Sequence, residues 1–134
     1  MSKVAQLALL IVFQASLADA SGSCPVTLVS GTRGLNSIAI TFRNASKQPI
    51  RRLEFNCTLA NAKANKNQRT PCYEKNALFF PGTEYTVIYA YPSGVRGPAR
   101  VSLKSVTFAD GPAWKPSKRD SCRVLNIYLA KIKR

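Results

Sequence analysis

Apolar and polar residues alternate in short runs along most of the chain after residue 25, and glycine, proline, asparagine and serine separate the runs. A period of two is typical of strands that bury one face, so the pattern predicts an all-β domain. The predicted strands span residues 26–29, 38–43, 50–59, 77–80, 84–91, 99–109 and 122–132. The last run also fits a helical stripe through Leu125, Leu129 and Ile132. The surrounding strands favour the strand interpretation.

Two irregularities interrupt this alternation. Ile50 is one residue out of phase with Leu53 and Phe55, which predicts a β-bulge at Arg51 and Arg52. A similar change of phase divides the strand predicted over residues 99–109. Residues 60–76 contain almost no apolar side chains and are expected to form a solvated loop.

Seven strands in one domain is the strand count of an immunoglobulin-like fold. The sequence therefore predicts a seven-stranded antiparallel immunoglobulin-like β-sandwich with two disulfides.

The first twenty residues have the pattern of a secretory signal. Lys3 precedes an apolar segment over residues 4–17, and the small residues Ala18 and Ala20 mark a cleavage site after residue 20. The alternative is a membrane anchor, for which the apolar run is short, since a spanning helix needs about 20 residues. We therefore expect a signal peptide over residues 1–20, one mature domain over residues 21–134, and a secreted or periplasmic protein.

The chain has four cysteines, and an exported chain with four cysteines is expected to form two disulfides. In the predicted sandwich the first and last strands run parallel, so Cys24 and Cys122 start neighbouring strands. Cys57 ends the third strand and Cys72 lies in the following loop. This placement favours Cys24–Cys122 and Cys57–Cys72 among the three possible pairings.

The residue inventory disfavours catalysis and metal binding. The 134 residues contain no histidine and only six acidic residues, which removes the commonest general base and metal ligand. The chain has no C-x-x-C motif and no glycine-rich phosphate loop. We therefore expect no catalytic residues, no cofactor and no metal site. Two N-x-S/T strings occur, at Asn44 and Asn56, and they matter only if the protein is glycosylated.

Charge is the one functional signal in the composition, because 20 Lys and Arg residues give a formal net charge of +14. A field of this strength attracts anionic partners. In the predicted fold the loop over residues 60–76 and the C-terminus share one end of the sandwich. The predicted polyanion-binding residues there are Lys63, Lys66, Arg69, Lys131, Lys133 and Arg134. Lys115, Lys118, Arg119 and Arg123 are expected at the opposite end. The alternative is a generally cationic surface without a site.

Three stretches carry a family resemblance: SIAITFRNASKQPIRRLEF, FFPGTEYTV and VSLKSVTFADGPAW. Over about residues 37–114 they resemble small secreted bacterial immunoglobulin-like domains, the FxLYD type among them. The literal F-x-L-Y-D string and the antibody Cys–Trp–Cys pattern are absent. The resemblance implies a non-catalytic module and names no ligand.

We therefore expect a monomeric, secreted binding or structural module that engages an anionic polymer or envelope surface. A specific nucleic acid is not expected as the partner. The alternative is a secreted cationic effector, either an antimicrobial protein or an inhibitor.

Overall fold

A computed structural model describes residues 24–61, 66–90, 97–120 and 122–129, with the backbone alone for residues 60–61 and 66–71. The described residues contain no helix, and the predicted all-β class is confirmed. The eight strands are β1 (Val26–Arg33), β2 (Ser37–Asn44), β3 (Ile50–Asn61), β4 (Lys66–Glu74), β5 (Glu84–Ala90), β6 (Ala99–Phe108), β7 (Ala113–Trp114) and β8 (Leu125–Ile127).

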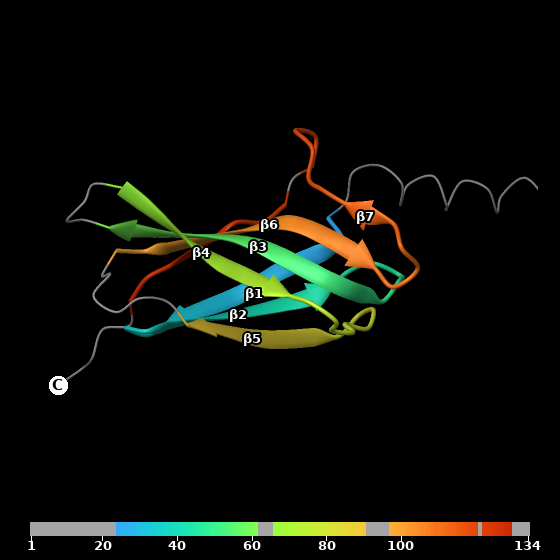
Figure 1. The fold of residues 1–134 in the computed structure, drawn as a ribbon, viewed down its shortest axis with the longest axis horizontal. Coiled ribbons are helices and arrows are strands. Elements are labelled where there is room, and N and C mark those ends of the chain that lie inside the picture. Colours follow the sequence, from blue (N-terminus) through green and yellow to red (C-terminus); the bar gives the residue numbers. More distant parts are fainter. Residues whose placement is uncertain (1–23, 62–65, 91–96, 121, 130–134) are drawn as a thin grey trace, which may run out of the picture.

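The strands form two antiparallel sheets, one above the other in Figure 1. The smaller sheet has the order β1-β2-β5. The larger sheet has the order β4-β3-β6-β7, and β8 also pairs with β6. β7 and β8 share that edge because they pair with opposite ends of β6, β7 with Val106 and Thr107 and β8 with residues 99–101.

One apolar core joins the two sheets. The alternating residues Ile38, Ile40 and Phe42 of β2 are all buried, and Phe55 of β3 faces them from the other sheet. The Phe42 and Phe55 ring centroids lie 5.6 Å apart, and Phe79 packs edge-on to Phe42 at 5.0 Å. The period of two in the sequence thus produces the buried layer that holds the sheets together.

The predicted bulges are present in the pairing of β3 with β6. The register shifts between Ile50 and Arg52, as the sequence phase indicated, and again between Glu54 and Phe55. A third irregularity lies in β1, between Leu28 and Ser30. Each extra residue changes which side chains face the core.

The solvated loop predicted over residues 60–76 is wrong. β3 continues to Asn61, and β4 pairs with it from Lys66 to Glu74. β4 is a polar edge strand: edge strands gain backbone hydrogen bonds from one neighbour and often carry charges and proline instead of apolar residues. The strand predicted over residues 77–80 is also wrong, because only Phe79 makes an isolated bridge, to Ile50.

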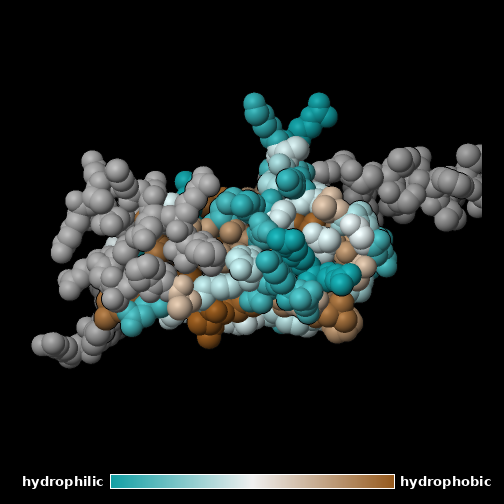
Figure 2. All heavy atoms as spheres, viewed as in Figure 1, coloured by the Kyte–Doolittle hydropathy of each residue, from teal (hydrophilic) through white to brown (hydrophobic). Residues whose placement is uncertain are grey.

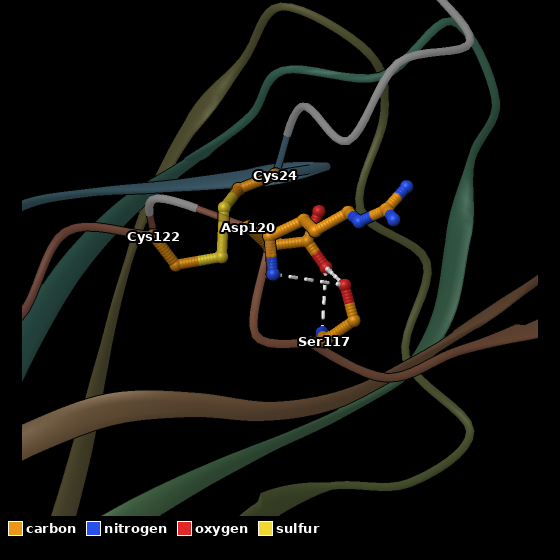
Figure 3. Close-up of a disulfide and its surroundings, with 5 residues drawn as sticks. Cys24, Ser117, Asp120 and Cys122 are labelled. Carbon is orange, nitrogen blue, oxygen red and sulfur yellow. Dashed lines mark hydrogen bonds between the residues drawn. A yellow bond between two sulfur atoms is a disulfide. The ribbon is translucent and has the colours of Figure 1, made fainter.

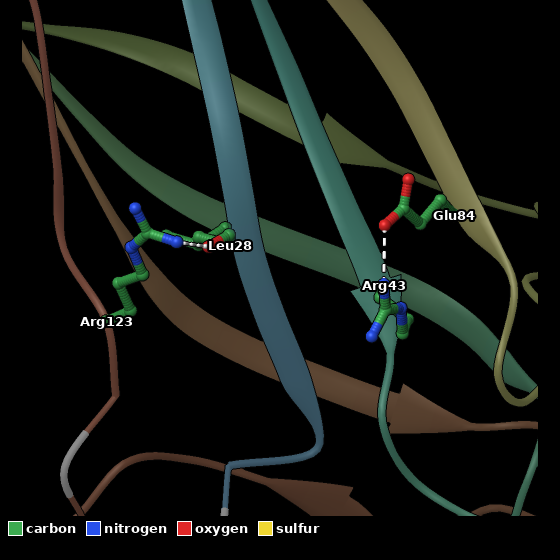
Figure 4. A network of polar contacts seen from close by, with 4 residues as sticks. All are labelled: Leu28, Arg43, Glu84 and Arg123. Atoms are coloured by element: carbon green, nitrogen blue, oxygen red, sulfur yellow. Dashed lines mark hydrogen bonds and ion pairs between the residues drawn. The ribbon is translucent and has the colours of Figure 1, made fainter.

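The last predicted element is a strand in the part of the chain that is described, but a short one, Leu125–Ile127. β8 lies beside β1 in the same direction, because Arg123 contacts β1 at Leu28 and Ile127 approaches it at Gly31. The Arg123 guanidinium donates a hydrogen bond to the Leu28 carbonyl, 3.2 Å away at the bulge (Figure 4). A Cβ on Gly31 would overlap the side chain of Ile127, so the glycine permits this close approach.

Both predicted disulfides, Cys24–Cys122 and Cys57–Cys72, are present. Figure 3 shows the first beside the turn in which the Asp120 carboxylate accepts hydrogen bonds from Ser117. The second joins two paired strands, since Cys72 lies opposite Phe55 in the ladder. The expectation that Cys72 lies in a loop is therefore wrong, although its partner was correctly identified.

Asn44 ends β2 with a fully buried side chain. Its Nδ2 donates to the carbonyls of Gln48 at 2.8 Å and Phe79 at 2.9 Å, while Oδ1 accepts from the backbone and hydroxyl of Ser46. This side chain ties the β2–β3 turn to the segment before β5. The N-x-S string at Asn44 is therefore a structural element, and its amide is not accessible for glycosylation in the folded protein.

Among the residues described, no helix has the length and apolar character needed to cross a membrane.

Candidate anion-binding groove

The outer face of the larger sheet carries the alternate residues of strands whose other face is buried. On β3, the outward residues Arg52, Glu54, Asn56 and Thr58 alternate with buried Leu53, Phe55 and Cys57. On β6, Arg100, Ser102 and Lys104 alternate with buried Val101 and Leu103 in the same way. Because β3 and β6 are paired, their outward side chains form one continuous polar surface.

This surface is hollowed into an open groove of about 640 Å³. β3 forms its floor and β6 one side, while Tyr73 near the end of β4 and Lys75 just after β4 form the other. Hydrophilic side chains gather over the right-hand part of β3 and β4 in Figure 2. The groove is thus built on three neighbouring strands, with β3 paired to both β4 and β6, which fixes the spacing of its side chains.

Positive charge dominates the groove. Four cations line it, Arg52, Lys75, Arg100 and Lys104, against one carboxylate, Glu54. The Glu54 carboxylate lies 3.0 Å from Arg52 Nη2 and 3.7 Å from Lys104 Nζ, so one carboxylate holds two of the cations in place. The lining keeps a net charge of +3, and these ion pairs are solvent-exposed enough to be exchanged for those of a ligand.

Hydrogen-bonding and aromatic groups lie between the cations. Asn56 lies opposite Ser102, and Thr58 lies opposite Arg100, so an amide and two hydroxyls that can donate and accept hydrogen bonds line the groove beside its cations. The Tyr73 ring is about half exposed, and Lys75 Nζ lies 5.0 Å from its centroid. A ring and a cation held together in this way can contact an apolar ligand face and an adjacent anion.

Two of the six predicted polyanion-binding residues, Lys66 and Arg69, lie in the described part of the chain. Lys63, Lys131, Lys133 and Arg134 lie outside the described residues. Lys66 and Arg69 belong to β4 instead of a loop, and in the strand register Arg69 lies opposite Thr58 of the groove and Lys66 opposite Asn61. Lys115, Lys118 and Arg119 are exposed in the segment after β7.

The groove cations were not among the predicted site residues, because most of them lie on strands and the prediction rested on charged loops and the C-terminus. The signal was present in β6, where Arg100 and Lys104 alternate with Val101 and Leu103. What local alternation does not reveal is that β6 lies beside β3 and that Tyr73 comes from a further strand.

Tyr89, on β5, has a shifted pKa. Burial, together with the nearby Glu74 carboxylate, raises the pKa of Tyr89 above its ordinary value, so this tyrosine stays protonated near neutral pH. Within the described residues, no three cysteine or acidic side chains are grouped to hold a metal ion. Comparison of the chain with known protein families and with curated proteins finds no match.

Proposed function

We propose that the chain is an exported immunoglobulin-like domain whose groove binds an anionic polymer without catalysis. The strand order supports the fold assignment. β1-β2-β5 corresponds to strands A, B and E of an immunoglobulin domain, and β3, β6 and β8 correspond to C, F and G. β4 then takes the place of the C′ strand beside C, as in variable-type domains.

Export is supported by the cysteines and by the signal-like N-terminus. All four cysteines of the sequence are paired in two disulfides, and such bridges persist in oxidising compartments. The resemblance of residues 37–114 to small secreted bacterial immunoglobulin-like domains agrees with this assignment.

The observation that carries the binding proposal is the charge of the groove, four cations around one carboxylate on the outer face of the larger sheet. Hydroxyl and amide groups between the cations suit a polymer that carries both anionic and hydroxyl groups, such as an acidic polysaccharide. An open groove that runs along strands can hold an extended segment of such a polymer. Binding releases counterions, so affinity falls as salt rises.

The proposal is tested with two variants of equal net charge. Arg52→Gln, Arg100→Gln and Lys104→Gln together remove three groove cations, whereas Lys115→Gln, Lys118→Gln and Arg119→Gln remove three exposed cations elsewhere. We expect the groove variant to lose much more affinity for heparin in titrations over a range of salt. Its plot of log affinity against log salt should flatten by roughly 2 for three lost contacts.

Equal losses in the two variants would mean that the +14 charge attracts polyanions diffusely, and the groove would not be a site. Killing or growth inhibition of a target cell by the wild-type protein at micromolar dose would instead favour the cationic-effector alternative.

A further inference from the structure

Backbone hydrogen bonds gather three segments at one end of the molecule, the right-hand end of Figure 1. The Gly82 N–H donates to the Asn44 carbonyl at 2.7 Å, the Ala109 N–H donates to the Pro49 carbonyl at 2.9 Å, and Ile50 and Phe79 exchange two hydrogen bonds at 2.9 Å. These bonds unite the β2–β3 turn, the segment before β5 and the β6–β7 turn. We call this end the tip and define it as residues 45–51, 75–83 and 109–112.

Two large apolar side chains project from the tip. Leu78 is 49% exposed and Phe80 is 53% exposed, while Phe79 between them is buried. Phe79 pairs with Ile50 in an antiparallel bridge and turns its ring into the core, so strand-like alternation places the side chains of residues 78 and 80 on the opposite, outward side. Figure 2 shows apolar side chains at this end next to hydrophilic ones. An adjacent, outward-pointing Leu and Phe differ from the scattered single apolar residues that any surface carries.

The exposure of this pair is fixed by the fold. The Phe80 N–H donates to the Tyr85 hydroxyl at 2.7 Å, and the Phe80 carbonyl accepts from Thr83 at 3.4 Å. Asn44 Nδ2 and the Ile50 N–H both donate to the Phe79 carbonyl. These bonds fix the backbone around Phe79 and Phe80 and so hold the pair at the tip.

The charges around the pair are mostly positive. Lys47 and Arg51 are exposed at the tip, and Asp110 is the one acidic residue in its three segments. Glu74 and Glu84 flank the segment over residues 75–83, and Glu84 is paired with Arg43 at 2.6 Å (Figure 4). The tip therefore combines an apolar projection with a cationic surround, which is complementary to an anionic lipid surface.

The attachment point of the leader lies at the same end. Residues 1–23 join the domain at Cys24, and the carbonyl of Pro25 accepts a hydrogen bond from Ala45 of the tip at 2.8 Å. The apolar segment over residues 4–17 is therefore connected at the tip.

We propose that the tip is a membrane-docking site, in which Leu78 and Phe80 enter the interfacial layer of an anionic bilayer while Lys47 and Arg51 contact its headgroups. An aromatic ring and an aliphatic side chain supply the apolar area, and each cation near the surface adds electrostatic attraction. The four docking residues do not line the groove, although Lys75 belongs to both the tip and the groove lining.

The test uses the purified exported protein and sedimentation with vesicles of phosphatidylcholine alone or with phosphatidylglycerol. The tip variant is Leu78→Ser with Phe80→Ser. The control is Leu35→Ser with Tyr128→Ser, which removes two similarly exposed apolar residues, 55% and 71% exposed, outside the tip. We expect the tip variant to lower the partition coefficient on phosphatidylglycerol vesicles at least fivefold and the control less than twofold. Arg51→Gln should lower it by a smaller factor, and only on the anionic vesicles.

A Phe80→Trp variant reports insertion independently of any loss of folding. Its fluorescence should shift to the blue on anionic vesicles, beyond any change from Trp114 in the wild-type protein. Equal loss in the tip variant and the control would overturn the proposal, as would an unshifted emission of the Phe80→Trp variant on vesicles that bind the protein. Absence of wild-type binding to both vesicles would overturn it as well.

Discussion

Replacement of Asn44 by Ala tests whether one buried amide holds the β2–β3 turn in place. The variant loses four hydrogen bonds, of which the one to the Phe79 carbonyl is buried and the other three are part-buried. A net hydrogen bond contributes about 0.5 to 1.5 kcal/mol, and an unsatisfied buried group costs about 1 to 3 kcal/mol. The Phe79 carbonyl keeps its bond from Ile50, and the Gln48 and Ser46 groups can reach water. The expected loss is therefore about 3 kcal/mol.

The assay is urea denaturation of the disulfide-bonded protein. A shift of the midpoint urea concentration, with the m-value unchanged, measures the change in stability. Asn44→Asp tests the two donated hydrogen bonds alone. It keeps the oxygen that accepts from Ser46 but places a second oxygen beside the Gln48 and Phe79 carbonyls, where the wild-type Nδ2 donates. Its carboxyl is favoured in the protonated form in the folded state, so its stability relative to wild type should fall as pH rises above the unfolded-state pKa of about 3.9.

Asn56→Ala, on the exposed outer face of β3, is the matched control and should change stability by less than about 0.5 kcal/mol. A loss below about 1 kcal/mol for Asn44→Ala, or equal losses for the two asparagines, would refute the assigned role of the buried network.

Three further predictions concern stability. Gly31→Ala should cost about 1 to 3 kcal/mol in denaturant melts because its Cβ overlaps Ile127, whereas Gly34→Ala, whose Cβ would lie 3.5 Å from Ser37 Oγ, should be nearly neutral. Equal effects would contradict the close packing of β8 on β1. Above a pH of about 10 the tyrosines of the unfolded chain ionise, whereas Tyr89 in the folded protein stays protonated to higher pH. The free energy of unfolding should therefore fall as pH rises, and Tyr89→Phe should reduce that fall. Replacement of both Cys57 and Cys72 by Ala should cost about 3 kcal/mol of stability, and replacement of both Cys24 and Cys122 about 5 kcal/mol. The Cys24–Cys122 bridge contributes more because it closes the longer loop. The reverse order would contradict the chain-entropy reasoning.

Local alternation was sufficient to predict most of the strands and their buried faces. Ile38, Ile40 and Phe42 all face the core, and the phase change at Ile50 marks a real bulge. Alternation failed where a strand has little to bury. β4 is polar along most of its length, and its strand character comes from the hydrogen-bond ladder with β3 and from the Cys57–Cys72 bridge.

The groove was less accessible to prediction than the fold. Its cations could be assigned to outward positions from the pattern of β6, where Arg100 and Lys104 alternate with buried residues. That Arg52 lies on the same surface depends on the pairing of β3 with β6, which are far apart in the sequence. Pairing over such a distance is set by the packing of the whole core, which no local sequence pattern specifies.

The most direct test of the proposed function is a residue-by-residue map of where an anionic polymer binds. Titration of the isotopically labelled protein with a short heparin oligosaccharide, followed by amide NMR shifts, gives such a map. Binding in the groove predicts the largest shifts at Asn56, Tyr73 and Ser102 and small ones on β1, β2 and β5. Largest shifts at Lys115, Lys118 and Arg119, or shifts spread evenly over all exposed cations, would contradict it.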